Sequence, residues 1–141
     1  MRRHKLLVPL LLAALLSLTT PAMTQSARQS IKNGNEKFAR AEYAEAIAIY
    51  RKALGAPGDL GAMARYNIGV CYYELGRSAE AAAEYRAALE TKKGRYPKAA
   101  YALGVALEDS KDWEQAKAAY RQAIDTSGGR YAEAHFRLGI L

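Results

Sequence analysis

Hydrophobic and small residues recur along this chain with a period of 35 residues. Four glycines share one register, and the last three follow a leucine or isoleucine: Gly34, Gly69, Gly104 and Gly139. Twelve residues after each of the first three comes an alanine, and four residues later a tyrosine: Ala46 and Tyr50, Ala81 and Tyr85, Ala116 and Tyr120. A fixed period of this length is typical of proteins built from stacked structural repeats.

Within each period the apolar positions lie three and four residues apart, which predicts two amphipathic helices joined by a short turn. In the second unit the first helix is expected over 62–75, ending at Gly76. Ser78 is expected to cap the second helix, which continues to about Thr91. The recurring glycine and alanine allow the two helices to approach to roughly 8–10 Å, and the tyrosine fills the remaining space.

The first and third units contain their own helix start and stop signals. Pro97 is expected at the first helical position of the third unit. Asp112 is expected to cap the partner helix, with Gln115 completing a capping box. In the first unit the second helix is expected over 43–54, ending at Ala56-Pro57-Gly58.

These residues resemble the tetratricopeptide repeat, a helix–turn–helix unit of 34 residues. The second unit carries the clearest match, with Tyr66-Asn67-Ile68-Gly69, Tyr72-Tyr73, Gly76, Ala81, Tyr85 and Ala88-Leu89. The resemblance implies an all-α fold, a right-handed α-solenoid of three repeats and one terminal helix. The expected units are residues 27–61, 62–96 and 97–131, with a partial fourth unit at 132–141.

The two ends of the array depart from the pattern. Asn33 and Lys37 are polar where the family prefers apolar residues, which suits an end unit with one face in water. The partial fourth unit is consistent with a terminal capping helix, and equally with a longer protein that continues beyond Leu141.

The first 27 residues have the three parts of a secretory signal peptide. Arg2, Arg3 and Lys5 precede an apolar run from Leu6 to Leu18, and small residues follow. We expect cleavage between residues 22 and 27, which leaves 28–141 as the repeat domain. The apolar run has about 13 residues against the roughly 20 that span a bilayer, which favours a cleaved signal over a membrane anchor. No membrane span is expected once this segment is removed. An exported, periplasmic or secreted protein follows, with an uncleaved inner-membrane anchor as the alternative.

The charge balance argues against a nucleic-acid binder. The formal charge is +7, with 21 basic and 14 acidic residues, and removal of Arg2, Arg3 and Lys5 leaves +4. This excess is spread over both faces of the predicted helices and forms no basic stripe. Nothing in the sequence indicates an oligomer.

The sequence offers no constellation that would support catalysis, a metal ion or a cofactor. Cys71 is the only cysteine, and we expect it to be a small buried side chain, with a dimerising thiol as the alternative. His135 lies where the family has a large packing side chain, so it too is expected to pack between helices. Glu45, Glu80 and Gln115 share one register, which indicates a solvated helix face.

The resemblance implies that the first helix of each unit lines a concave groove that binds a peptide or helix segment. The expected groove residues are Lys32, Asn35, Phe38, Tyr66, Asn67, Tyr73, Lys98 and Tyr101. One branch of the family clamps a peptide carboxylate at five positions. Asn35, Asn67 and Lys98 match three of them, whereas Ile31 and Ala102 occupy the positions of a lysine and an arginine.

Two functional hypotheses follow. The first is a non-enzymatic scaffold or adaptor that binds a protein partner through the groove in the bacterial cell envelope. The second is that the repeats form the N-terminal portion of a larger exported protein and serve a separate effector or enzyme domain. The sequence does not identify the partner.

Overall fold

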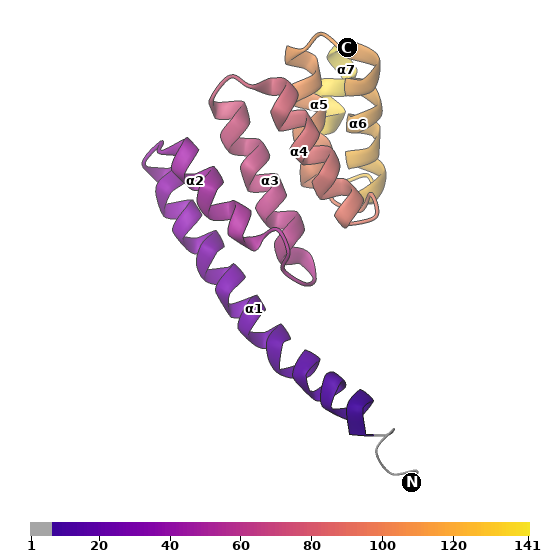
Figure 1. Cartoon of the computed structure of the whole chain (residues 1–141). Coiled ribbons are helices and arrows are strands. Elements are labelled where there is room, and N and C mark those ends of the chain that lie inside the picture. Colours follow the sequence, from indigo (N-terminus) through magenta and orange to yellow (C-terminus); the bar gives the residue numbers. More distant parts are fainter. Residues whose placement is uncertain (1–6) are drawn as a thin grey trace.

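The structure of the chain is a computed structural model that describes the backbone of residues 7–141 and the side chains from residue 21 onwards. The described residues form α-helices and one short 3₁₀-helix, and they contain no strand (Figure 1). The elements are α1 (Leu7–Ala39), α2 (Tyr43–Tyr50), η1 (Arg51–Ala53), α3 (Asp59–Glu74), α4 (Ser78–Thr91), α5 (Pro97–Asp109), α6 (Trp113–Thr126) and α7 (Ala132–Ile140). The all-α prediction is therefore confirmed.

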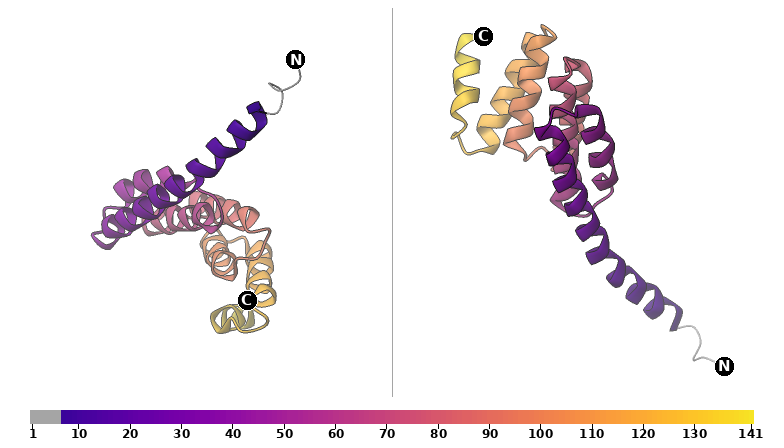
Figure 2. Two further views of the ribbon diagram at one scale, coloured as in Figure 1. Left: turned by 90° about the horizontal axis from the view of Figure 1, so that it is seen from below. Right: turned by 90° about the vertical axis from the view of Figure 1, so that its left-hand side faces the viewer.

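The helices form antiparallel pairs that stack in chain order. The helix α1 pairs with α2, α3 with α4 and α5 with α6, and α7 packs against α6. Contacts between α2 and α3, and between α4 and α5, join each pair to the next. Figure 2 shows that successive pairs turn relative to one another, so the array bends between its first and last helices. This is the stacked helical solenoid that the 35-residue period predicts.

A glycine on the first helix of each pair leaves room for the tyrosine ring of the second helix to pack against the backbone. A Cβ atom at Gly69 would lie 2.6 Å from Cε1 of Tyr85, and one at Gly104 would lie 2.5 Å from Cε1 of Tyr120. Gly34 meets Tyr50 in the same way. Because real side chains do not come this close, only glycine allows the ring to lie directly against the first helix. The repeat pattern predicts close helix approach at this glycine, and the structure identifies the tyrosine ring as the group that the missing side chain admits.

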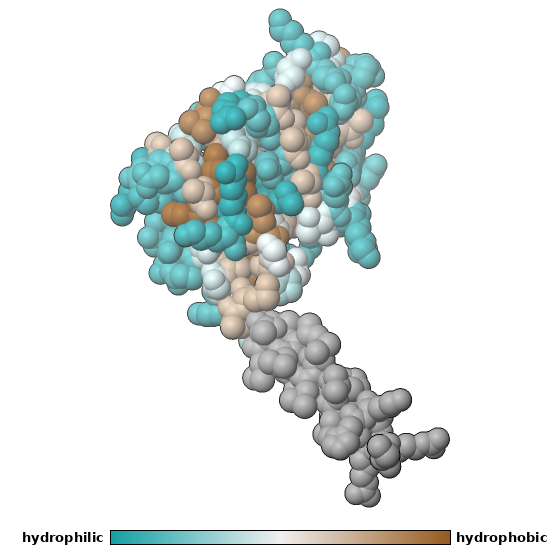
Figure 3. Space-filling view, viewed as in Figure 1, coloured by the Kyte–Doolittle hydropathy of each residue, from teal (hydrophilic) through white to brown (hydrophobic). Residues whose placement is uncertain are grey.

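Small side chains fill the remaining space between the helices. Ala46, Ala81 and Ala116, the alanines of the repeat, are fully buried. The largest cluster runs from α4 to α7, and two smaller clusters lie around Tyr50 and around Ala27 and Ile31. Alanine is the commonest buried residue in these clusters, and tyrosine and leucine side chains pack around the close helix contacts that it allows. In Figure 3 the surface is mainly hydrophilic, and apolar side chains emerge between hydrophilic ones over α2 and α3.

Several predicted helix ends are confirmed. Pro97 begins α5, and the Asp112 side chain accepts a hydrogen bond from the backbone N–H of Gln115 at the start of α6. The capping box itself is not formed, because the Gln115 side chain donates to the Asp112 carboxylate, at 2.5 Å, and the Asp112 N–H donates to the Leu107 carbonyl. Gly76 follows α3 with a φ angle of +70°, a left-handed conformation that glycine adopts at no steric cost.

Two further predictions about helix ends are wrong. Ser78 does not cap α4. It is the first residue of the helix, and its hydroxyl donates to the Asp109 carboxylate of the next unit at 3.3 Å. The helix expected over 43–54 ends as an α-helix at Tyr50 and continues as η1. There the backbone tightens to hydrogen bonds three residues apart, with the N–H of Leu54 donating to the carbonyl of Arg51.

The first helix of the first repeat is the C-terminal part of the long helix α1. Ala27 is 2% exposed and packs with Ile31, Ala53 and Ala64. Ala27 is therefore part of the packed array rather than of a segment outside it. Within the described part of the chain, no helix combines the length and apolar character that a membrane crossing needs.

The contact between glycine and tyrosine predicts different effects on stability for the same substitution at two equivalent positions. In Gly104→Ala the new methyl group would overlap the Tyr120 ring, so we expect a loss of about 1–3 kcal/mol in the free energy of unfolding. Gly139→Ala is the matched control, because a Cβ there meets no atom within 4 Å. It should leave stability unchanged or raise it by about 0.5–1 kcal/mol through helix propensity. Urea unfolding followed by circular dichroism measures both, and equal effects at the two positions would contradict the assignment.

Candidate functional site

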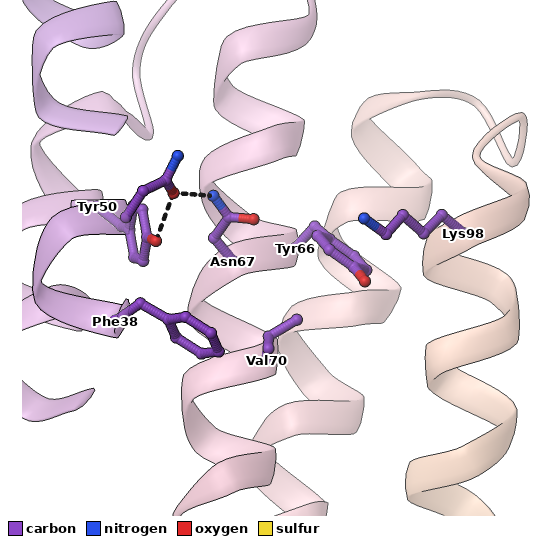
Figure 4. Close-up of a pocket in the computed structure, with 7 residues that line it drawn as sticks. Phe38, Tyr50, Tyr66, Asn67, Val70 and Lys98 are labelled. Carbon is purple, nitrogen blue, oxygen red and sulfur yellow. Dashed lines mark hydrogen bonds between the residues drawn. The ribbon is translucent and has the colours of Figure 1, made fainter. Parts of the chain in front are cut away.

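A pocket of about 250 Å³ opens where α1, α3 and α5 face one another. Its lining is formed by Asn35, Phe38, Tyr50, Tyr66, Asn67, Val70 and Lys98. Figure 4 shows Tyr66, Asn67 and Val70 on the central helix, with Phe38 and Tyr50 on one side of them and Lys98 on the other. Three successive repeats therefore contribute to this pocket, which we call the α3 pocket.

Two asparagines from neighbouring repeats meet at the rim of the α3 pocket. The hydroxyl of Tyr50 donates to Oδ1 of Asn35 at 2.7 Å, and Nδ2 of Asn67 donates to the same oxygen at 3.4 Å (Figure 4). Because Asn35 Oδ1 accepts both bonds, its Nδ2 group remains a donor. The network links α1, α2 and α3 and fixes the orientation of the Asn35 amide.

Lys98 lies over an aromatic side chain at the other end of the α3 pocket. Its Nζ atom is 4.9 Å from the centre of the Tyr66 ring, a cation–π geometry. Tyr66 packs in turn on Tyr85 and Tyr96, with ring centres 5.6 and 5.7 Å away. Burial raises the pKa of Tyr66 to about 12. Among the described residues, no carboxylate lies within ion-pair distance of Lys98.

Lys98 and the side-chain N–H groups of the two asparagines therefore give the α3 pocket one cation and several hydrogen-bond donors, beside the Asn67 carbonyl oxygen and the tyrosine hydroxyls, which can also accept. No aspartate or glutamate lines the pocket. The remaining surface is supplied by Phe38, Val70 and the Tyr66 ring, which are apolar and partly buried. Such a site can hold a group that combines negative charge with an adjacent apolar side chain.

The structure brings together five of the eight groove residues expected from the sequence: Asn35, Phe38, Tyr66, Asn67 and Lys98. The other three lie elsewhere. Lys32 is exposed on α1 outside the pocket. Tyr73 is half-buried, and burial together with a hydrogen bond to Asp109 raises its pKa. Tyr101 lies one repeat further along, beside Phe136 and Arg137.

The surroundings of Tyr101 repeat those of Tyr66. Tyr101 packs on Tyr120 at 5.6 Å and stacks on Tyr131 at 5.2 Å. Here the cation is Arg137, whose guanidinium donates to the Glu108 carboxylate at 3.0 Å. Because Glu108 neutralises this cation, the excess of positive charge at the α3 pocket is not repeated at Tyr101.

Tyr50 was missed as a pocket residue by the sequence analysis. It lies on the second helix of its unit, and its repeat position assigned it to packing against Gly34. The structure gives it both roles, because its ring covers Gly34 while its hydroxyl reaches Asn35. Its position sixteen residues after the glycine could have indicated a hydroxyl at the rim of the groove.

The structure confirms the prediction for Cys71 and contradicts the prediction for His135. Cys71 is fully buried as predicted, and burial raises the pKa of its thiol to about 11. The expectation for His135 is wrong. It is exposed, and its Nε2 atom lies 3.0 Å from the Gly129 carbonyl oxygen, because its side chain turns toward the preceding loop. The described residues contain no cluster of side chains that could hold a metal ion.

Comparison with known proteins identifies the family. A family model described as tetratricopeptide repeat matches residues 31–100 and 101–141. The chain belongs to the tetratricopeptide repeat family. Repeats of this family are typically interaction modules without enzymatic activity, and their chemistry lies in what they bind. No protein of curated function matches the chain in sequence.

Solved tetratricopeptide repeat domains share the fold over most of the chain. The Sgt2 domain from Aspergillus fumigatus has 30% sequence identity and a TM-score of 0.72, over 81% of this chain and 75% of that one. The first repeat domain of Spaghetti (RPAP3), bound to the HSP90 peptide SRMEEVD, has 26% identity and a TM-score of 0.72. That match covers 82% of this chain and 89% of the other. The first repeat domain of human RPAP3 matches at 25% identity and a TM-score of 0.72, over 82% of this chain and 88% of that one.

The buried tyrosines predict that stability falls at alkaline pH. The pKa values of Tyr50 and Tyr66 are raised to about 12, chiefly by burial, and those of Tyr85 and Tyr120 are raised further. A phenol whose folded pKa exceeds its unfolded value of about 10 stabilises the fold fully below pH 10. That contribution is lost as the pH rises through 12.

Urea midpoints measured by circular dichroism should therefore be level up to about pH 9 and fall above about pH 10. Because lysines also lose their charge in this range, Tyr66→Phe provides the control. This variant should lose less stability between pH 9 and pH 12 than the wild type. An equal loss in both proteins would show that Tyr66 does not contribute.

Proposed function

We propose that this chain is a non-enzymatic binding module whose α3 pocket holds an acidic peptide segment of a partner protein. The observation that carries the proposal is the composition of the pocket. It gathers Lys98 and two asparagine amides from three successive repeats and contains no acidic side chain. A carboxylate of the partner would accept hydrogen bonds from these groups, and charge-assisted bonds of this kind are the strong ones.

The apolar part of the α3 pocket adds a second requirement for the partner. Phe38, Val70 and Tyr66 form a surface beside the donors, which suits an aliphatic side chain next to the bound carboxylate. Aromatic rings supply a large contact area at low conformational cost. The preferred ligand is therefore a peptide in which an aliphatic residue stands next to an acidic one.

A relative with a bound peptide supports this chemistry. The first repeat domain of Spaghetti (RPAP3) is bound to the peptide SRMEEVD, which ends in two glutamates, a valine and an aspartate. In the present chain, Ile31 is buried beside Ala27 and Ala102 has no charge. Fewer cations therefore face a ligand here than in the carboxylate-clamping branch of the family. We infer that binding depends strongly on Lys98.

We further propose that the protein acts in the bacterial cell envelope. The support is the N-terminal sequence, in which basic residues, an apolar run and small residues follow one another in the order of a secretory signal. Because Ala27 is buried in the first repeat, cleavage after Ala22 would preserve the packed array, whereas cleavage after Ala27 would remove part of it.

The first experiment measures binding of a fluorescent SRMEEVD peptide by polarisation. Lys98→Ala should weaken binding about tenfold, which corresponds to about 1.4 kcal/mol for a charge-assisted contact. Lys93→Ala is the matched control, because Lys93 is an exposed lysine of the α4–α5 loop outside the α3 pocket. The same peptide with an amidated C-terminus should bind more weakly to the wild type. Equal affinities for both variants, or no binding of the acidic peptide, would refute the proposal.

The second experiment tests export. The full chain is produced in a bacterium, the envelope fraction is isolated, and the intact mass of the protein is measured. We expect a product that begins at Met23 and retains Ala27 in the packed first repeat. A product that still begins at Met1, or a protein confined to the cytoplasmic fraction, would contradict the proposed location without affecting the peptide-binding result.

A further inference from the structure

The three connections at one end of the array carry only basic charges. Because successive helices run in opposite directions, the connections that follow α2, α4 and α6 lie at the same end (Figure 1). They span residues 51–58, which include η1, residues 92–96 and residues 127–131. They contain no acidic residue and six basic ones, which we call the basic end: Arg51, Lys52, Lys92, Lys93, Arg95 and Arg130.

The basic end accounts for the whole positive excess of the repeat domain. Residues 28–141 contain 18 basic and 14 acidic side chains, so the 12 basic residues outside the basic end are outnumbered. The connections at the opposite end, 40–42, 75–77 and 110–112, contain three basic and two acidic residues. A glutamate in the first turn follows each of them, at Glu45, Glu80 and Glu114. The excess that was expected over both helix faces therefore lies in the connections at one end.

Most of these cations have no acidic neighbour. All of them except Lys92 are exposed. Among the described residues, no carboxylate lies within ion-pair distance of four of them: Lys52, Lys93, Arg95 and Arg130. A hollow of about 420 Å³ opens between the first two connections, and it is lined by Gly58, Asp59, Thr91, Lys92, Lys93 and Arg95. Since Lys92 pairs with Asp59, Lys93 and Arg95 leave this hollow positively charged.

Two features indicate which anionic partner suits the basic end. Its cations are distributed over the connections of three successive repeats, so they match an extended anionic surface better than a single small ion. Residues 7–18 of the apolar run lie in the part of α1 that leaves the array at this same end (Figure 1). A membrane that holds this run therefore lies on the side of the basic end, and the more acidic opposite end points away from it.

We propose that the basic end binds the anionic headgroups of a phospholipid membrane. Phosphate oxygens accept hydrogen bonds from lysine and arginine side chains. Each such residue close to an anionic membrane strengthens binding about fivefold, so several together hold the array on the surface. The basic end shares no residue with the α3 pocket, so this inference does not depend on the proposed acidic peptide.

The test measures cosedimentation of the full chain with two kinds of vesicle. One kind contains phosphatidylcholine alone, and the other contains about one third phosphatidylglycerol, which is anionic. The wild type should bind the anionic vesicles at least tenfold more tightly at low salt, and this preference should disappear at about 1 M salt, where charges are screened. Arg2, Arg3 and Lys5 are present in every variant, so comparison between variants removes their contribution.

Lys93→Glu/Arg95→Glu should weaken binding to the anionic vesicles at least tenfold. The matched control is Arg40→Glu/Lys111→Glu, which makes the same charge change in two connections of the opposite end. Lys111 has a φ angle of +59° and Lys93 one of +50°, so the two lysine substitutions meet the same left-handed backbone. The control should bind the anionic vesicles like the wild type.

A second variant, Lys52→Glu/Arg130→Glu, changes the first and third connections and should also weaken binding at least tenfold, because all three connections meet the membrane. Equal affinities of Lys93→Glu/Arg95→Glu and its control would overturn the proposal, as would a wild type that binds both kinds of vesicle equally. A complex of the wild type with a short DNA duplex that anionic vesicles fail to displace would overturn it in favour of a nucleic-acid site.

Discussion

The structure depends on the contact between a glycine of one helix and the tyrosine ring of the next. It occurs at Gly34, Gly69 and Gly104, each time with the tyrosine sixteen residues later. The missing side chain lets the aromatic ring lie against the helix backbone, and this determines how close the two helices come. Helices of 8 to 16 residues such as α2 to α7 are marginal alone in water, so their stability comes from this packing.

The same contact positions the candidate site. Tyr66, Asn67 and Val70 lie within one turn of Gly69, on the helix that the Tyr85 ring holds in place. Tyr50 belongs to both systems, because its ring covers Gly34 and its hydroxyl orients the Asn35 amide. The groove is therefore a consequence of the packing, and its donors are preorganised before any ligand arrives. Lys98 comes from the next repeat, so the site requires the stacked array rather than a single unit.

The period in the sequence was sufficient to predict the helical repeats, because packing contacts recur in register. It was also sufficient for most of the pocket, since residues near each glycine face the groove. The period could not show that Lys98 lines the α3 pocket whereas Tyr101 lies outside it. Among the residues that the structure describes, no carboxylate pairs with Lys98 near Tyr66, whereas Arg137 near Tyr101 is neutralised by Glu108, a contact between α5 and α7 that no local pattern reveals. Ser78 and His135 were misjudged for a similar reason. The Ser78 side chain reaches Asp109, and the His135 side chain reaches the Gly129 carbonyl. Neither partner lies on the helix that carries the side chain.

The central claim is that the surface around Asn35, Asn67 and Lys98 binds an acidic peptide. The most direct test follows the side-chain amide signals of Asn35 and Asn67 by NMR while unlabelled SRMEEVD is added to the ¹⁵N-labelled chain. These amides come from two of the three repeats that line the pocket. The account predicts that both signals shift together and saturate at one peptide per chain. Shifts confined to the exposed faces of α2, α4 and α6, with both asparagine signals unchanged, would contradict it.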